Sequence, residues 1–230
     1  MKGWNWEGFL EYLFNPYLLE GAVTTLALTA AAIVGGLVLG CLLSALRMSQ
    51  NPIASALAKT YIWIFRGTPL LVQLIIIYTG LPQLGVKFSV IESALLGLIL
   101  NEAAYLAEII RSGILGVSAG QSSAARALGL NSLQVMTYVV LPQAVRIIVP
   151  ALGNSVNGLL KTTSVCSVIS MEELLRKTQI LIQEKFMVLE LFAVAALYYL
   201  LMTSLWDIVQ RRIERRFGRA YKTITLSETH

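Results

Sequence analysis

Two long stretches without a charged residue restrict the possible fold of this chain more than any other feature. One runs from Gly21 to Leu46 and the other from Gly67 to Val86. A charge-free apolar run of about 20 residues is long enough to cross a hydrocarbon core about 30 Å thick. Because lipid offers no hydrogen-bond partner, the backbone of such a run must satisfy its polar groups within a helix. The sequence therefore predicts an all-α integral membrane protein.

Apolar segments recur along the chain, and only 13% of its residues are charged, against about 25% in soluble domains. They predict five spans within a single membrane domain covering residues 1–230. The spans are expected at about 18–46, 60–82, 89–112, 146–168 and 187–210. Residues 113–143 are too polar to span, and residues 211–230 form a basic tail.

The basic residues predict the orientation of the spans, since lysine and arginine collect on the cytoplasmic side. An external N-terminus and a cytoplasmic C-terminus place most of them on that side. Six basic residues directly follow the last apolar segment: Arg211, Arg212, Arg215, Arg216, Arg219 and Lys222. This position is typical of a contact with anionic lipid, and no nucleic-acid partner is expected.

The cysteine and histidine content argues against metal or disulfide chemistry. Cys41 and Cys166 lie in apolar stretches, and the single histidine is His230. A protein metal site needs a cluster of such ligands. No metal site and no disulfide are therefore expected.

The polar segment between the third and fourth spans is predicted to form two short helices at the cytoplasmic membrane face. Residues 121–130 contain good helix formers, and Gly129 is placed to end the first helix. Asn131 or Ser132 can cap the second, which Pro142 is expected to interrupt. Such a pair could cover a loop at the interface or dock a partner, and the local sequence favours neither.

This segment also resembles the permease signature of ABC importers. The family pattern is Glu-Ala-Ala, three residues, Gly, nine residues, Ile, one residue and Leu-Pro. The matching positions are Ser123, Ala124, Ala125, Gly129, Val139, Leu141 and Pro142. The spacing is kept throughout. Ser123 replaces the acid, so an ionic contact through that acid is not expected here.

Further motifs resemble the polar amino-acid uptake branch of these permeases. In chain order they are Arg66-Gly67-Thr68-Pro69-Leu70-Leu71-Val72-Gln73, residues 104–113, Gly120-Gln121, Leu141-Pro142-Gln143-Ala144 and Lys161-Thr162-Thr163-Ser164. Each is weak alone, but together they cover nearly the whole chain in order. The chain is identified on this basis as similar to the permease subunits of bacterial polar amino-acid importers.

The resemblance implies the type I ABC importer (MetI-like) permease fold in the bacterial cytoplasmic membrane. Such permeases pair as homodimers or heterodimers and receive their substrate from an extracytoplasmic binding protein. Their cytoplasmic helices, here Ser123 to Pro142, dock on ATPase subunits that bind ATP and Mg²⁺. This sequence has no Gly-rich phosphate loop ending in Gly-Lys-Ser/Thr. It is therefore expected to be no enzyme and to bind no cofactor itself.

Polar residues on the third and fourth spans suggest where an amino acid would bind. Asn154, Asn157, Lys161 and Ser164 share one helical face, with Thr163 beside them; the third span offers Asn101, Tyr105, Glu108 and Ser112, with Glu102 adjacent. We predict a path between these two faces, in which Lys161 anchors the substrate α-carboxylate. The alternatives are hydrogen bonds between helices and an ion pair of Lys161 with Glu102 or Glu108.

Residues Arg66, Gly67, Thr68 and Pro69 mark a break in the second span. Pro69 lacks a backbone donor and disfavours helical geometry at Thr68. The break is interpreted either as a simple kink or as the hinge of a gate.

Two other functional classes remain open from the residues alone. A self-powered carrier or ion channel could use Glu102, Glu108 and Lys161 for protons or ions. A membrane-embedded enzyme would need a nucleophile–base pair or a metal set, for which the sequence gives no plausible candidate.

Overall fold

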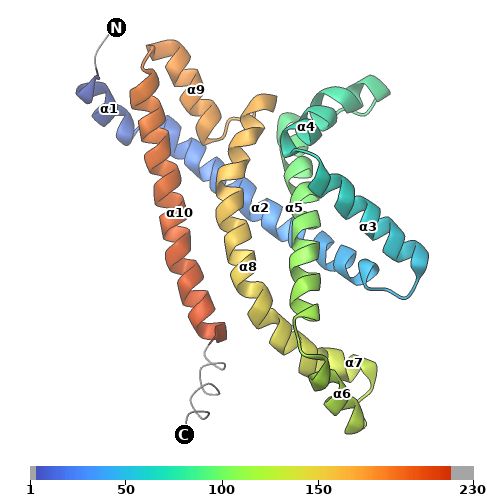
Figure 1. Ribbon diagram of the computed structural model, residues 1–230. Helices are drawn as coiled ribbons and strands as arrows, with labels where there is room; N and C mark the ends of the chain where they lie inside the picture. Colours follow the sequence, from blue (N-terminus) through green and yellow to red (C-terminus); the bar gives the residue numbers. More distant parts are fainter. Residues whose placement is uncertain (1–3, 219–230) are drawn as a thin grey trace, which may run out of the picture.

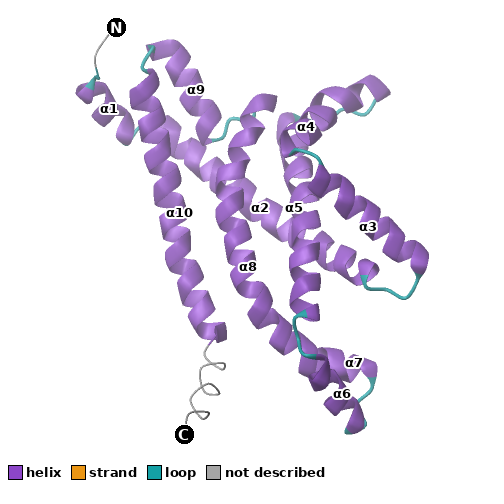
Figure 2. Cartoon of the chain, in the orientation of Figure 1, coloured by secondary structure: helices purple, strands orange, loops and turns teal. Residues whose placement is uncertain are grey.

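The computed structural model describes residues 4–218, and this part of the chain is helical without strands (Figures 1 and 2). The long helices are α2 (Pro16–Arg47), α3 (Pro52–Gly67), α5 (Val90–Leu115), α8 (Leu141–Thr162) and α10 (Val188–Gly218). The short ones are α1 (Trp6–Leu13), α4 (Leu70–Ile75), α6 (Ala119–Ala127), α7 (Ser132–Gln134) and α9 (Leu174–Lys185). Short π or 3₁₀ helical segments extend three of the ten α-helices of the described chain. They are Ile76–Gly80 and Leu81–Leu84 after α4, Val135–Val140 after α7, and Thr163–Ile169 after α8.

Side-chain caps fix where several helices begin. Asn15 and Asn51 accept hydrogen bonds from the first turns of α2 and α3, and each is followed by a proline at the first helical position. Ser89 and Glu92 form a capping box at the start of α5. These signals are local, so the sequence specifies the helix starts independently of packing.

Four continuous helices are long and apolar enough to cross a membrane: Pro16–Arg47, Val90–Leu115, Ser132–Ile169 and Val188–Phe217. A fifth crossing exists if α3 and the helical segment Leu70–Leu84 count as one span, and these are bent by 102°. Consecutive spans run in opposite directions, so the two ends of the described chain lie at opposite ends of the bundle (Figure 1). The predicted fold class is confirmed.

Two predicted boundaries in the middle of the chain differ from the structure. The second span begins earlier than predicted, because α3 starts at Pro52 and not near residue 60, whereas the break before Pro69 lies where it was predicted. Pro142 does not interrupt the helix as predicted. A π-helical turn leads directly into α8, and Pro142 lies in the first turn of α8. There its missing N–H and its ring are tolerated.

The predicted basic tail is partly helical. The last span does not end at residue 210, because α10 continues to Gly218 and carries Arg211, Arg212, Arg215 and Arg216. Arg219 and Lys222 lie outside the described residues.

The segment between the fourth and fifth spans forms α9, which packs against α2 and α10. Glu173 caps α9 and is fully buried. Burial raises the pKa of its carboxyl, while hydrogen bonds from the backbone of Leu175 and Arg176 and from the Tyr199 hydroxyl oppose that rise. This buried contact joins the start of α9 to α10.

Helix α2 crosses α5 at close range, and glycine makes the approach possible. A β-carbon on Gly36 would lie 3.2 Å from the Glu102 side chain. One on Gly40 would lie 3.0 Å from the Leu106 side chain and 3.2 Å from the Ala103 carbonyl oxygen. The two glycines, four residues apart, form the small-residue spacing that lets membrane helices pack backbone to backbone.

We predict that Gly40→Ala lowers the free energy of unfolding of the protein in detergent by about 1–3 kcal/mol, which is the range for overpacked cores. Gly158→Ala is the matched control, because a β-carbon there meets nothing within 4 Å. Unfolding followed by tryptophan fluorescence measures both. Equal stability of the two variants would show that the close crossing is not needed.

Candidate functional site

The residues predicted to matter for function fall into three separate places. These are the α6–α7 pair at one end of the bundle, the break between α3 and α4, and the central part of α8 with its neighbours (Figure 1). In the described chain, most side chains of the predicted polar faces of α5 and α8 contact other helices, and the path between the two faces stays a prediction.

The α6–α7 pair is built by two local caps. Gly129 has a φ of +86°, which favours glycine because other residues carry a β-carbon. Its N–H bonds to the Arg126 carbonyl at 2.9 Å, and the Leu130 N–H bonds to the Ala125 carbonyl at 3.2 Å, the pattern of a Schellman motif. Asn131 then forms a capping box with Gln134. The predicted helix end at Gly129 is confirmed.

The surface of this pair is open and apolar. Ala125 is buried, with Val135 and Val140 in the same core, while Ser123 and Ala124 are exposed. Leu128, Leu133 and Tyr138 are 82%, 73% and 73% exposed. Leu141 and Pro142 are exposed at the start of α8. Such a surface can bind a partner that covers it.

The break between α3 and α4 is fixed by side chains of two helices. Thr68 is extended, with φ of −118° and ψ of 144°, as expected for a residue before proline. Gln73 Nε2 donates to the carbonyls of Phe65 at 3.0 Å and Thr68 at 3.1 Å. Asn101 Nδ2 donates to the same Phe65 carbonyl at 3.2 Å and to Gln73 Oε1 at 3.0 Å. Carbonyls freed by the break are thereby satisfied.

One carboxylate gathers three arginines beside this break. Glu108 on α5 pairs with Arg47 on α2, with Arg111 at 3.1 Å, and with Arg66 at 3.8 Å. The Arg66 guanidinium lies over the Tyr105 ring, 5.3 Å from its centre. A cavity of about 450 Å³ is lined by Arg47, Arg66, Tyr105 and Glu108 of this cluster, together with Lys59 and Trp63. Its walls carry more positive than negative charge, so it suits an anionic group.

The polar residues of α8 have different neighbours from those predicted. Asn157 Nδ2 donates to Asp207 Oδ1 at 2.7 Å, and Gln210 Nε2 donates to Asn154 Oδ1 at 3.2 Å. Both asparagines therefore tie α8 to α10, which is the hydrogen-bonding alternative. Sequence reasoning missed Asp207, although an acid within the last apolar helix was a visible signal.

The other side chains that were predicted to bind substrate do not lie together in the described chain. Thr163 is fully buried and donates to the Leu160 carbonyl, and Ser164 donates to the Lys161 carbonyl at 2.6 Å. Glu102 is buried and accepts from Ser155 of α8, while Tyr105 faces Arg66 instead. The Thr163 hydroxyl is inaccessible in the described chain, and its role as a substrate ligand stays a prediction.

Lys161 is exposed within a membrane-spanning helix. Among the described residues it forms no ion pair with Glu102, which accepts from Ser155, or with Glu108, which pairs with arginines. An intramembrane charge normally has a partner. A partner for Lys161 would therefore come from outside the described residues.

We predict that Glu108→Gln destabilises the protein by about 2 kcal/mol, because the arginines around it would lose their common carboxylate. The double variant Arg47→Gln/Glu108→Gln should recover part of that loss, since one repelling cation is removed. Thermal unfolding in detergent measures both. If the single variant is as stable as the unsubstituted protein, the cluster contributes nothing to the fold.

Comparisons with known proteins give consistent matches. The family model described as "Binding-protein-dependent transport system inner membrane component" matches residues 32–219. The chain is 38% identical to the arginine transport system permease protein ArgU of Corynebacterium glutamicum, over 97% of this chain and 76% of that protein. It is 37% identical to the glutamine transport system permease protein GlnP of Escherichia coli, over 87% and 93% of the two chains.

Solved structures agree in fold. A crystal structure of an amino acid ABC transporter with histidines superposes with a TM-score of 0.89, at 36% identity over 94% of this chain and 100% of that chain. An inward-facing methionine ABC transporter, MetNI, gives a TM-score of 0.73 at 21% identity, over 87% of this chain and 96% of that chain.

Proposed function

The chain belongs to the family of binding-protein-dependent transport system inner membrane components, and from this we propose that it carries polar amino acids across the membrane. It is a permease subunit of an ATP-driven ABC importer. Its relatives are named for arginine and glutamine transport, which supports a polar amino acid as substrate.

The observation that carries this proposal is the exposed α6–α7 pair within the region that the family model matches. The apolar side chains of Leu128, Leu133 and Tyr138 project from it without cover in the described chain. An ATPase subunit would cover them, with Ser123 and Ala124 among the contacts. ATP and Mg²⁺ would be bound by that subunit, and this chain would perform no hydrolysis.

The orientation that fits this arrangement has α6, α7 and the end of α10 in the cytoplasm. Those elements lie at one end of the bundle, and α1 and α9 lie at the other (Figure 1). The basic residues of α10 support this orientation. A binding protein would then deliver substrate at the α1–α9 end, and a second permease chain would complete the path.

Lys161 is our candidate for the residue that holds the substrate α-carboxylate. It is exposed in the single chain and lies on a membrane-spanning helix. Every free amino acid has that carboxylate, so one cation can serve several substrates. The break at Arg66–Pro69 is our candidate hinge of a gate, because the helices on its two sides differ in direction by 102°.

Transport requires that ATP and substrate favour different states of the path. A change of shape in the ATPase would reach α5 and α8 through the α6–α7 pair, which follows α5 after a short turn and leads into α8. Loss of the correct turn at Gly129 should therefore uncouple ATP hydrolysis from substrate transport.

We predict that Gly129→Val abolishes the stimulation of ATP hydrolysis by substrate-loaded binding protein, in complexes reconstituted in liposomes. Valine is strained at a φ of +86°, whereas asparagine tolerates left-handed geometry. Gly129→Asn is thus the matched control and should keep most of the stimulation. No atom lies within 4 Å of the added β-carbon, so the two variants differ through backbone conformation. Normal stimulation in the valine variant would contradict the docking role.

We further predict that Lys161→Met lowers amino-acid uptake at least tenfold while assembly and basal ATP hydrolysis persist, because the carboxylate loses its charged partner. Lys161→Arg serves as the control, since arginine keeps a positive charge at the same position and should retain most of the uptake. Uptake is measured with radiolabelled arginine and glutamine. Uptake unchanged in the Lys161→Met variant would remove this residue from the substrate path.

A further inference from the structure

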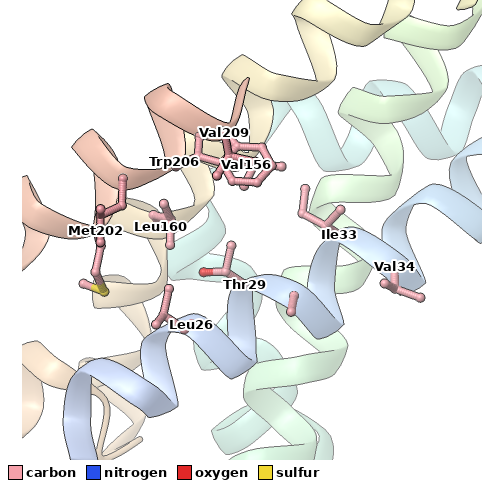
Figure 3. Close-up of a pocket in the computed structure, with 11 residues that line it drawn as sticks. Leu26, Thr29, Ile33, Val34, Val156, Leu160, Met202, Trp206 and Val209 are labelled. Carbon is pink, nitrogen blue, oxygen red and sulfur yellow. The ribbon is translucent and has the colours of Figure 1, made fainter. Parts of the chain in front are cut away.

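A long apolar groove lies between α2, α8 and α10, apart from the polar residues described above (Figure 3). Its volume is about 490 Å³, and Ile33, Val156, Leu160, Trp206 and Val209 are among its lining residues. A second cavity of about 170 Å³ shares Val156 and Trp206 with it and extends to Ile213. The two cavities together follow the α8–α10 seam toward the end of α10.

The polar groups that line this groove are already paired within the chain. The Thr29 hydroxyl donates to the Thr25 carbonyl at 2.8 Å, and Trp206 Nε1 donates to the Gly153 carbonyl at 2.8 Å. The Gln210 amide nitrogen donates to Asn154 and Glu214. The walls therefore offer hydrocarbon and no unsatisfied donor. A polar amino acid would lose its hydration here without compensation, whereas an acyl chain would not.

The end of the groove is flanked by two arginines. On α8, Arg146 precedes Val149 by three residues and Gly153 by seven, and both line the second cavity. On α10, Arg216 follows Ile213 by three residues and Val209 by seven. These spacings keep each arginine on the groove-facing side of its helix. Both are exposed, and neither pairs with a carboxylate in the described part of the chain.

We propose that this groove binds an anionic phospholipid, with an acyl chain along Trp206 and Val156 and the phosphate between Arg146 and Arg216. The apolar walls match the chain, and the two cations match the headgroup at the depth where the helices leave the bilayer. An apolar surface of a second protein chain would instead leave both arginines without a counter-charge. The inference depends on the helices spanning a membrane and not on the transported substrate.

Trp206 provides a direct probe, because bromine on a lipid acyl chain quenches tryptophan fluorescence on contact. The other tryptophans, Trp4, Trp6 and Trp63, are 40%, 67% and 74% exposed and can be changed to phenylalanine. The full chain is placed in phosphatidylcholine vesicles that contain a minor fraction of brominated phosphatidylglycerol or of brominated phosphatidylcholine. We expect phosphatidylglycerol to quench Trp206 with the higher apparent affinity, by about fivefold for each arginine.

A charge-matched pair of variants tests the headgroup contact. Arg146→Gln/Arg216→Gln should abolish the preference for brominated phosphatidylglycerol. The control is Arg211→Gln/Arg215→Gln, which also removes two positive charges. Both of these arginines lie on the side of α10 opposite Trp206 and Ile213, so this variant should keep the preference for brominated phosphatidylglycerol. Loss of the preference in both would show general attraction to an anionic surface and would overturn the site.

A second pair tests the acyl chain without changing charge. Ala30 of α2 lines the groove, whereas Ala31 is exposed and does not. Ala30→Phe should reduce quenching of Trp206 by either lipid, and Ala31→Phe should not. The proposal is wrong if both brominated lipids quench the starting protein equally. It is also wrong if neither quenches because a second copy covers Trp206, which cross-linking between chains at Ala30→Cys would reveal.

Discussion

Each helix break in this protein has to satisfy the backbone groups that it frees, because lipid offers no water to bind them. At the bend before Pro69, the amides of Gln73 and Asn101 supply the missing donors to the end of α3. Before Pro142 a π-helical turn carries the chain into α8 without interruption. The bend is therefore accommodated within the bundle, and α5 contributes to it through Asn101.

Most ionisable side chains within the bundle also have partners on neighbouring helices. Glu108 serves three arginines from three helices, and Glu102 is held by Ser155 in the tight crossing of α2 and α5. Asp207 binds Asn157 between α8 and α10. Ionisable and amide groups that could have lined a path are thus largely used to join helices. Lys161 stands apart, and this is why it remains the strongest candidate for an external anionic partner.

One end and the flank of the bundle have distinct chemistry. The α6–α7 pair presents large apolar side chains on two short helices, whose connection is fixed by the turn at Gly129 and the capping box of Asn131 and Gln134. The flank between α2, α8 and α10 presents a groove whose polar atoms are all internally bonded. The first surface can transmit movement from a protein partner, whereas the second is matched to lipid.

The sequence by itself determined the membrane class, the number of apolar segments and the local caps, including the left-handed turn at Gly129. These features depend on composition and on residues within a few positions of each other. Periodicity also showed that Asn154, Asn157 and Lys161 lie toward one side of a helix. Only the tertiary structure decided that the asparagines meet α10 and that Tyr105 meets Arg66. Helical spacing fixes which residues share a face, but the crossing of distant helices fixes which neighbour that face contacts.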